Sequence, residues 1–347
     1  MINHEEAILE SIVLHRVGNK AEDDGIRFSK SPLKTDETVN ELLIRYFFSP
    51  FKQQEYYNLF HESDLSMNEV YRYASGIFDD PETLYHQSVD LAKHLYEHSE
   101  HPKIKRGEFY VVYFSDCVVD GELVDAVGLF KSESRETYLK VYARDDNFEI
   151  NHEDGININK LDKGCLIFNT EKEKGFLVAV VDNLSKGSEA HYWKDDFLHI
   201  AQRQDEFFHT NNVMQLCKQF VKEKLPGEFD VNKVDQADML NKSATFLKEN
   251  EKFNLDAFTT EVIQQPEVIE SFKNYKEEYE SEQDFQIADD FEISGAAAKK
   301  SSRFLRSVIK LDKNFHIYVH GNRENIEKGF DDTTCKHYYR LYFDQET

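Results

Sequence analysis

A run of basic residues that contains no acid stands near the C-terminal end of the sequence. Residues 294–311 read SGAAAKKSSRFLRSVIKL, and their cations are Lys299, Lys300, Arg303, Arg306 and Lys310. Lysine and arginine along one segment can neutralise successive phosphates and gain free energy by releasing counterions. Arginine would serve as a bidentate phosphate donor and lysine as a point charge. This segment is the first candidate for contact with a phosphate backbone.

The conformation of this basic segment decides whether its charges share one surface. In a helix over residues 297–310, positions 299, 303, 306 and 310 would form one stripe, opposite Phe304 and Val308. In a rival structure, a β-hairpin begins by Ser307, breaks the stripe and leaves Lys310 on a strand. A third interpretation is a solvated segment that pairs with the acids just before it.

The preceding segment carries the opposite charge. Residues 266–292 contain ten acids and two lysines, which gives a local net charge of -8 by direct count. The part from Glu277 to Glu292 could bind a basic partner or imitate the charge of DNA. The sequence therefore supports a second hypothesis, in which the chain is an acidic protein-interaction module that reaches its site of action through a protein partner.

A second basic cluster lies earlier in the chain. Lys103, Lys105 and Arg106 stand in HPKIKRGE, on the loop before the first strand of the predicted sheet. These residues are candidates for secondary DNA contacts. Ordinary surface composition explains three charges on a loop equally well.

The sequence has no recognisable catalytic constellation. It lacks a glycine-rich phosphate loop, a dinucleotide fingerprint, HExxH and a nucleophile elbow. Glu122, Asp125, Glu136 and Lys140 could be imagined as a magnesium-dependent nuclease site, but alternating charges on an exposed sheet face explain the same positions. We therefore predict that the protein is not an enzyme and holds no cofactor.

Metal binding is not expected either. His152, Glu153 and Asp154 are the densest group of ligand types, but adjacent residues on an extended chain point to opposite faces, and Gly155 favours a polar turn. The cysteines, Cys117, Cys165, Cys217 and Cys335, are far apart and are predicted to be free thiols in a reducing compartment. Trp193 is expected to pack in a core rather than to stack on a base.

The composition indicates a folded, acidic protein. The chain has 347 residues, 40% of them hydrophobic, with a formal net charge of -24 and a pI near 5.0. The length is sufficient for two domains. The start MINHEEAILE places acids where a secretory signal would be basic, and no apolar run approaches a membrane span. We expect a cytoplasmic protein with no membrane partner.

The order of hydrophobic patterns predicts an α+β fold whose first domain covers residues 1–188. Apolar alternation predicts five strands after a first strand at residues 8–17, and helical spacing predicts three helices. The helices are residues 35–48, 67–77 and 81–98, and the later strands are residues 108–116, 123–132, 137–143, 164–170 and 176–183. Short connections imply a largely antiparallel sheet with helices packed on one side.

The second domain, residues 189–347, is predicted to be mainly helical and to end in a small β-hairpin sheet. LSKGSEA supplies the small polar residues of a linker near residues 184–192. Helices are expected over residues 193–210, 213–224, 231–249, 255–263 and 267–279. SVIKLDKNFHIYVHG then predicts a hairpin, to which residues 338–343 would add a strand.

Four of these segments together resemble a known family. They are ILESIVLHRV, FLVAVVDNLS, HYWKDDFLHIAQRQD and SVIKLDKNFHIYVHG. In this order, they look like bacterial nucleoid-associated proteins of the 37-kDa type, in the branch of Bacteroidetes-like bacteria. The resemblance implies a cytoplasmic protein at the nucleoid that binds double-stranded DNA without strong sequence preference and has no known catalytic centre.

The resemblance brings no motif of functional residues, so the basic positions named above depend on charge alone. A net charge of -24 departs from what a DNA-coating protein needs, because sequence-independent binding depends on neutralising phosphates. Direct contact with DNA and recruitment through a protein partner at the nucleoid both stay open. The sequence does not give the oligomeric state, and a homodimer is one alternative.

Overall fold

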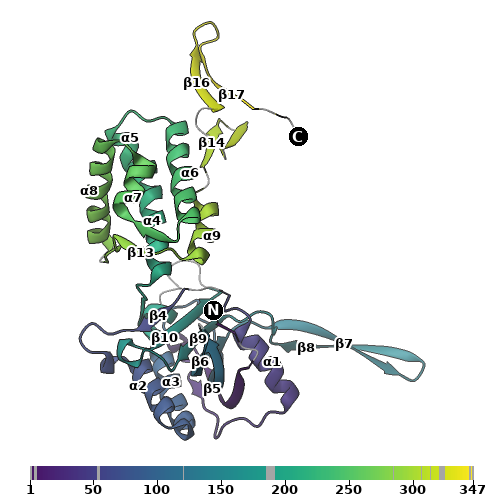
Figure 1. The fold of residues 1–347 in the computed structure, drawn as a ribbon. Coiled ribbons are helices and arrows are strands. Elements are labelled where there is room, and N and C mark those ends of the chain that lie inside the picture. The colour runs from purple at the N-terminus through teal and green to yellow at the C-terminus, as the bar shows by residue number, and fades with distance from the viewer. Residues whose placement is uncertain are drawn as a thin grey trace. The chain divides into compact units, whose positions relative to one another are not determined.

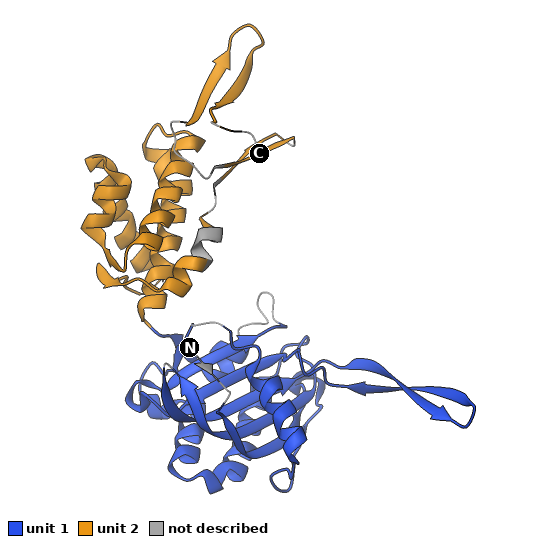
Figure 2. Cartoon of the chain, turned by 45° about the vertical axis from the view of Figure 1, so that its right-hand side comes forward, with its two compact units in different colours: residues 1–203 blue, residues 204–347 orange. Residues whose placement is uncertain are grey.

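The computed structural model describes most of the chain, in two compact units. The described residues are 2–3, 6–52, 55–119, 121–184, 192–283, 285–305, 307–312, 314–319, 325–343 and 345, with side chains described at all of these except 2, 3, 300–303, 307 and 319. Unit 1 is residues 1–203 and unit 2 is residues 204–347 (Figure 2).

Unit 1 is built on a nine-stranded antiparallel sheet (Figure 1). The strand order is β11-β4-β10-β9-β6-β5-β2-β3, and β1 pairs with β5. The strands are β1 (Ile2–Asn3), β2 (Ile8–Val17), β3 (Ile26–Arg27), β4 (Tyr57–Leu59), β5 (Gly107–Val119), β6 (Glu122–Ser132), β9 (Lys163–Phe168), β10 (Leu177–Asp182) and β11 (Ile200–Gln202). The antiparallel pairing confirms the predicted sheet.

Two glycines make the turns that set the register of this sheet. Gly121 has φ +89° between β5 and β6, and Gly175 has φ +96° before β10. A Cβ atom on Gly175 would lie 2.0 Å from the carbonyl oxygen of Leu59, so no other residue fits there without displacing β4.

Helices cover both faces of the sheet, whereas the sequence analysis predicted one face only. Alternate residues of a strand point to opposite faces. On β5, Val112 packs in a cluster with Phe47 of α1 (Glu37–Phe48), and Val111 packs in a second cluster with α2 (Glu69–Asp79) and α3 (Leu84–Glu97). The one-sided arrangement is wrong because strands such as β5 are apolar on both faces. Short 3-10 helices complete the unit: η1 (Lys20–Glu22), η2 (Leu65–Met67), η3 (Pro81–Thr83) and η4 (Lys172–Lys174).

The segment around Trp193 differs from the long helix predicted over residues 193–210. It forms a π-helix, η6 (Tyr192–Leu198), and then β11, which pairs with β4. Trp193 is fully buried in the cluster that contains α2 and α3, which confirms the packing role predicted for it. Residues 192–203 belong to unit 1, although the sequence analysis placed them after its boundary at residue 188.

A separate two-stranded arm extends from unit 1 (Figures 1 and 2). It consists of β7 (Glu136–Arg144) and β8 (Asn147–Gly155), which pair with each other and with no other strand that the structure describes. The sequence analysis predicted β7 but interpreted His152 to Asp154 as a turn. This was wrong, because the three residues lie within β8 and pair with β7.

Unit 2 is mainly helical, as predicted, around a core of aromatic side chains that includes Phe220, Phe253 and Phe272. α6 begins at a capping box formed by Asn232 and Asp235. The helices are α4 (Glu206–Gln219), α5 (Leu225–Glu228), α6 (Lys233–Glu249), α7 (Leu255–Phe258), α8 (Pro266–Gln283), α9 (Gly295–Phe304) and the π-helices η7 (Phe220–Lys224) and η8 (Thr259–Ile263). β12 (Lys252–Asn254) pairs with β13 (Asp290–Glu292).

Two separate hairpins lie near the C-terminal end. β14 (Ser307–Leu311) pairs with β15 (Phe315–Val319), which confirms the predicted hairpin. The predicted further strand is β17 (Lys336–Leu341), but it pairs with β16 (Ile326–Asp331) and does not join β14 and β15. In the described part of the chain, no helix combines the length and apolar character that crossing a membrane requires.

Candidate nucleic-acid interface

The predicted DNA-binding segment is a helix followed by a strand. α9 starts after Ser294, whose carbonyl oxygen accepts the backbone N–H of Ala298 at 2.9 Å. The helix ends at Phe304, and β14 begins at Ser307. A single helix over residues 297–310 is therefore wrong, and the rival structure with a hairpin from Ser307 is confirmed. The β-branched pair Val308 and Ile309 favours the strand.

This break distributes the predicted cations over two elements. Lys299, Lys300 and Arg303 are positions of α9, and the Lys299 side chain is exposed. Lys310 is exposed on β14, opposite His316 of β15. Arg306 lies outside the described residues. Whether these cations share one surface therefore depends on the elements that pack against both α9 and β14.

α4 and the π-helix after it supply cations next to the end of α9. Lys218 Nζ lies 3.0 Å from the ring centroid of Phe304, in a cation–π contact. Partial burial and, second, the nearby charge of Lys222 lower the pKa of Lys218. Two ammonium groups that repel each other create a local preference for an anion. Phe304 therefore connects α9 to a basic part of unit 2.

Three lysines from different elements surround one recess of about 510 Å³. Lys222 comes from η7, Lys233 from the first turn of α6 and Lys310 from β14. Ile309 is buried against Val234 and Ala237 of α6, which holds β14 at this position. The recess is lined by Lys222, Lys233, Gln236, Ala237, Leu240, Val308, Ile309 and Lys310. We call this site the lysine recess.

The lining of the lysine recess contains no carboxylate among the described residues. All three ammonium-bearing residues are exposed, and Lys233 Nζ donates to Gln236 Oε1 at 3.0 Å. Lysines around one recess, with no carboxylate in its described lining, give a positive potential suited to a polyanion such as the phosphate backbone. The lysines of the described lining are donors of the kind that phosphate oxygens accept from.

Many other lysines of the chain are paired with acids. The buried Lys163 lies 2.7 Å from Asp182, and the buried Lys131 lies 3.1 Å from Glu133. At the surface, Lys20 pairs with Glu97 at 2.8 Å. A lysine in such a pair must give up its carboxylate before it can bind a phosphate, so its gain from phosphate binding is smaller. The lysine recess differs from these sites because its described lining contains no carboxylate, although the molecule as a whole is acidic.

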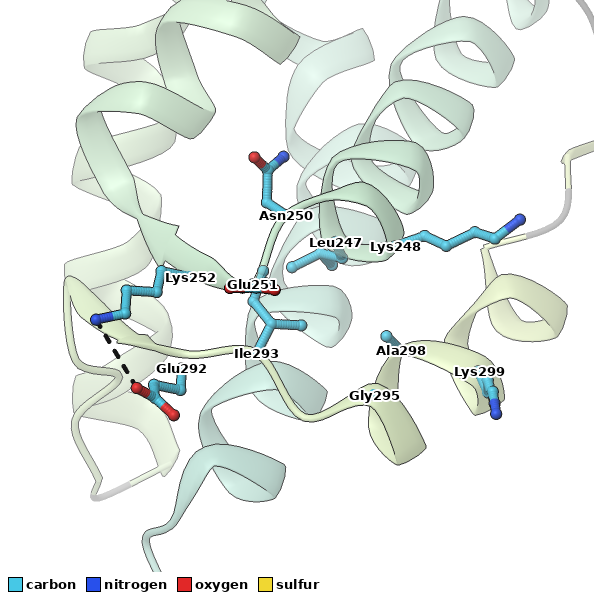
Figure 3. A pocket seen from close by; sticks show the side chains of 10 residues that line it. All are labelled: Leu247, Lys248, Asn250, Glu251, Lys252, Glu292, Ile293, Gly295, Ala298 and Lys299. Atoms are coloured by element: carbon cyan, nitrogen blue, oxygen red, sulfur yellow. Dashed lines mark ion pairs between the residues drawn. The ribbon is translucent and has the colours of Figure 1, made fainter.

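A second recess, of about 650 Å³, has mixed charge. Lys299 lines it, together with two other lysines and two glutamates. Lys252 Nζ and Glu292 pair at 3.8 Å, and Figure 3 shows Lys248 and Lys299 on the other side of the recess from this pair. The acids here weaken its attraction for phosphate. Lys299 therefore contributes to the rim of a mixed site rather than to the lysine recess.

The loop with the secondary basic cluster belongs to unit 1. Lys103, Lys105 and Arg106 are exposed, and Ile104 between them is buried. The backbone N–H of Lys105 donates to Glu133 Oε2 at 3.3 Å, and the carbonyl oxygen of Ile104 accepts from the Asn19 side chain at 2.9 Å. These bonds hold the loop in place and leave its cations at the surface of unit 1.

The nuclease and metal alternatives have no geometric support. Glu122 and Asp125 lie on β6, whereas Glu136 and Lys140 lie on the separate arm. Glu136 accepts from Lys160 at 2.6 Å, and Lys140 pairs with Glu153 at 2.5 Å. Among the described residues, no group of three or more histidine, cysteine or acidic side chains is placed to hold a metal ion.

Sequence reasoning missed Lys218, Lys222 and Lys233. A weak signal was present in LCKQFVKEK, where Lys218 and Lys222 are four residues apart and therefore share one face of a helix. Nothing in the sequence shows that Lys233 and Lys310 join them, since this depends on the packing of β14 against α6.

Comparison with known proteins agrees with the resemblance noted in the sequence. No curated protein sequence matches the chain. A protein-family comparison matches residues 13–339, which is nearly the whole chain, to the family described as "Nucleoid-associated protein YejK". The match includes both units and the lysine recess. The chain therefore belongs to this family of nucleoid-associated proteins.

Proposed function

We propose that this nucleoid-associated protein is a cytoplasmic protein that binds double-stranded DNA directly, without strong sequence preference and without catalysis. The observation that carries the proposal is the lysine recess, which Lys222, Lys233 and Lys310 line with no carboxylate in the lining that is described. Lys299, Lys300, Arg303 and Arg306 extend the contact from α9 and the residues after it, and Lys103, Lys105 and Arg106 are secondary contacts in unit 1.

The charge of the whole molecule limits this binding but does not prevent it. A net charge of -24 repels DNA at long range, whereas salt screens such repulsion over about 10 Å at 0.1 M. Contacts within the recess are shorter than this length. Each phosphate neutralised by a lysine releases condensed counterions, so affinity falls steeply as salt rises. We therefore expect weak, salt-sensitive binding that reads the backbone and not the base edges.

The test is a titration of duplex DNA, followed by fluorescence anisotropy, at about 50 and 200 mM salt. Lys222→Ala, Lys233→Ala and Lys310→Ala are combined in one variant. Loss of three phosphate contacts should reduce the slope of log K against log salt by roughly 0.9 for each contact, and should weaken binding equally for duplexes of unrelated sequence.

A matched control removes the same charge elsewhere. Lys20→Ala, Lys93→Ala and Lys172→Ala remove three lysines that pair with acids, so this variant should keep the wild-type affinity and slope. Equal behaviour of the two variants would remove the lysine recess from the proposal. A third variant, with alanine at positions 299, 300, 303 and 306, tests the contribution of the α9 segment.

Recruitment through a protein partner gives a different result. In that case the wild-type chain would not bind duplex, and a basic protein would co-purify with it after nuclease treatment. Three of the acids proposed for such a partner already pair within unit 2: Glu278 pairs with Lys224 at 3.0 Å, and Glu280 and Asp289 pair with Lys276 at 2.8 and 3.0 Å. This pairing favours direct contact with DNA.

A further inference from the structure

The lysine recess has an apolar floor in addition to its lysines. Ala237, Leu240 and Ile309 line the recess and are only 2%, 2% and 4% exposed, and Val308 adds a half-buried side chain. A duplex presents sugar and phosphate along its backbone and keeps its bases stacked inside, so it can use the exposed lysines and not this floor. Contact with duplex DNA therefore leaves the floor unexplained.

The size of the lysine recess suits a small ligand. Its volume of about 510 Å³ lies within the range of about 300–1,000 Å³ that is typical of small-molecule sites. Such sites combine apolar walls with a few polar groups that fix the orientation of the ligand. Gln236, which is 5% exposed, supplies one such group, because a carboxamide can both donate and accept hydrogen bonds. Its Oε1 accepts from Lys233 Nζ at 3.0 Å, which ties the carboxamide to one of the cations.

An exposed aromatic ring lies beside the recess. Val308 of β14 is directly opposite Tyr318 of β15, and residues opposed in this way share one face of the hairpin. Lys310 is two residues after Val308 on β14 and therefore points to the same face. The Tyr318 side chain is 57% exposed. Its ring is therefore accessible to a ligand at the Val308 side of the recess.

The opposite face of this hairpin holds it in place. Ile309 and Ile317 are opposed on that face, and both pack in the cluster that contains Val234 and Ala237 of α6. Because this packing anchors β14 and β15 on α6, Tyr318 and the lysines of the recess belong to one packed group of elements in unit 2.

The floor, the ring and the lysines together define the chemical class of a ligand. A flat apolar body would cover the floor and stack on Tyr318, as nucleobases stack on aromatic side chains. A polyanionic end would accept hydrogen bonds from the three lysines, whose ammonium groups act as point charges. A nucleoside triphosphate has both parts in one molecule. Phosphate or polyphosphate without a base would leave the floor and the ring unused.

We propose that the lysine recess binds a free nucleoside triphosphate, which competes with duplex DNA for Lys222, Lys233 and Lys310. The base would lie on the apolar floor beside Tyr318, with its edge at the carboxamide of Gln236, and the phosphates would lie among the lysines. The competition rests on the proposed function, whereas nucleotide binding does not. Binding of the nucleotide would release the duplex, so the recess would link DNA binding to the supply of nucleotide.

The first experiment is isothermal titration calorimetry of the full chain at a constant ionic strength of about 50 mM. The two probes are ATP and inorganic tripolyphosphate. The chain should bind one ATP, with an affinity about tenfold above that for tripolyphosphate, because only ATP has a base that can stack. Equal affinities for the two probes would overturn the proposal, since the recess would then respond to charge alone.

Tyr318→Ala tests the stacking contact without removing a charge. The side chain is exposed, so the change should leave the fold intact. We expect about a tenfold loss of affinity for ATP and no change for tripolyphosphate or duplex, which do not stack on the ring. The matched control is Phe315→Ala, since Phe315 is 66% exposed on the same strand and points to the opposite face. Unchanged ATP affinity in Tyr318→Ala, or an equal loss in both variants, would contradict the proposal.

The variant that lacks the three recess lysines tests whether the two ligands share one site. It should lose affinity for ATP and for tripolyphosphate, whereas the control variant at Lys20, Lys93 and Lys172 should keep both. In the anisotropy titration, ATP should displace a labelled duplex from the wild-type chain. Displacement from Tyr318→Ala should require about tenfold more ATP.

Three further outcomes separate the nucleotide site from the proposed function. Salt-sensitive binding of duplex without any binding of ATP would overturn the nucleotide site and support DNA binding. Binding of ATP by a chain that does not bind duplex would support the nucleotide site and overturn the proposed function together with the competition. Simultaneous binding of both ligands, without displacement, would overturn the competition.

Discussion

One side chain of unit 1, His15, is held neutral at pH values where a histidine in water would be protonated. His15 is only 1% exposed, its Nε2 lies 2.9 Å from Ser88 Oγ, and its Nδ1 accepts the backbone N–H of Ser29 at 3.2 Å. An Nδ1 that accepts a hydrogen bond has no proton, so the ring is neutral. Burial lowers the pKa of His15 to about 4. The folded protein therefore keeps His15 in its neutral form above about pH 4.

This state predicts a loss of stability in acid. The unfolded chain takes up a proton at His15 near pH 6.5, whereas the folded chain resists it until about pH 4, so the free energy of unfolding falls as pH decreases through this window. The contribution of His15 between pH 7.5 and 5 is about 2 kcal/mol. Urea unfolding at both pH values should show a smaller decrease for His15→Gln, whose amide can still donate to Ser88. An equal decrease in both proteins would show that His15 is not responsible.

At the scale of elements, regular patterns were predictable and tertiary pairings were not. β2 has the predicted bounds, Ile8–Val17, because its side chains alternate between two buried faces. η6 was taken for a helix of ordinary type, since its apolar residues have helical spacing. β8 was missed because its side chains are exposed on both faces, so its sequence has no alternation of buried and exposed positions. The lysine recess depends on three elements that are far apart in sequence.

The turn at Gly175 gives a prediction about an element. Gly121 and Gly175 both have positive φ, but a Cβ atom at Gly121 meets nothing within 4 Å, whereas one at Gly175 meets the Leu59 backbone. Gly121→Ala should cost about 1 kcal/mol of unfolding free energy through backbone strain alone. Gly175→Ala should cost several times as much, because β4 must also move. Denaturant unfolding of both variants measures the difference. Equal losses of unfolding free energy would show that β4 can move without destabilising the protein.

At the scale of the whole molecule, each unit has its own hydrophobic core. The two clusters of unit 1 cover the two faces of its sheet, and the largest cluster of unit 2 runs from Val213 to Leu305. A set of elements with its own core can fold alone. The family assignment covers both units, and the branch within the family stays a prediction.

Residues 1–203 are therefore expected to fold without unit 2. Expressed alone, this segment should unfold cooperatively, and its transition should coincide with one of two transitions in calorimetry of the full chain. Residues 1–188, the domain predicted from sequence, lack Trp193 and β11 and should be markedly less stable, since they expose the core that Trp193 covers. A single transition of the full chain, or an unfolded 1–203 segment, would contradict two independent domains.

The lysine recess has one more consequence, which concerns how the protein would move along a chromosome. A site that contacts only phosphates meets the same chemistry at every step of the duplex, so a chain bound as we propose would slide and hop rather than stop at one sequence. Its distribution over the nucleoid would then follow the local density of duplex and not particular sequences.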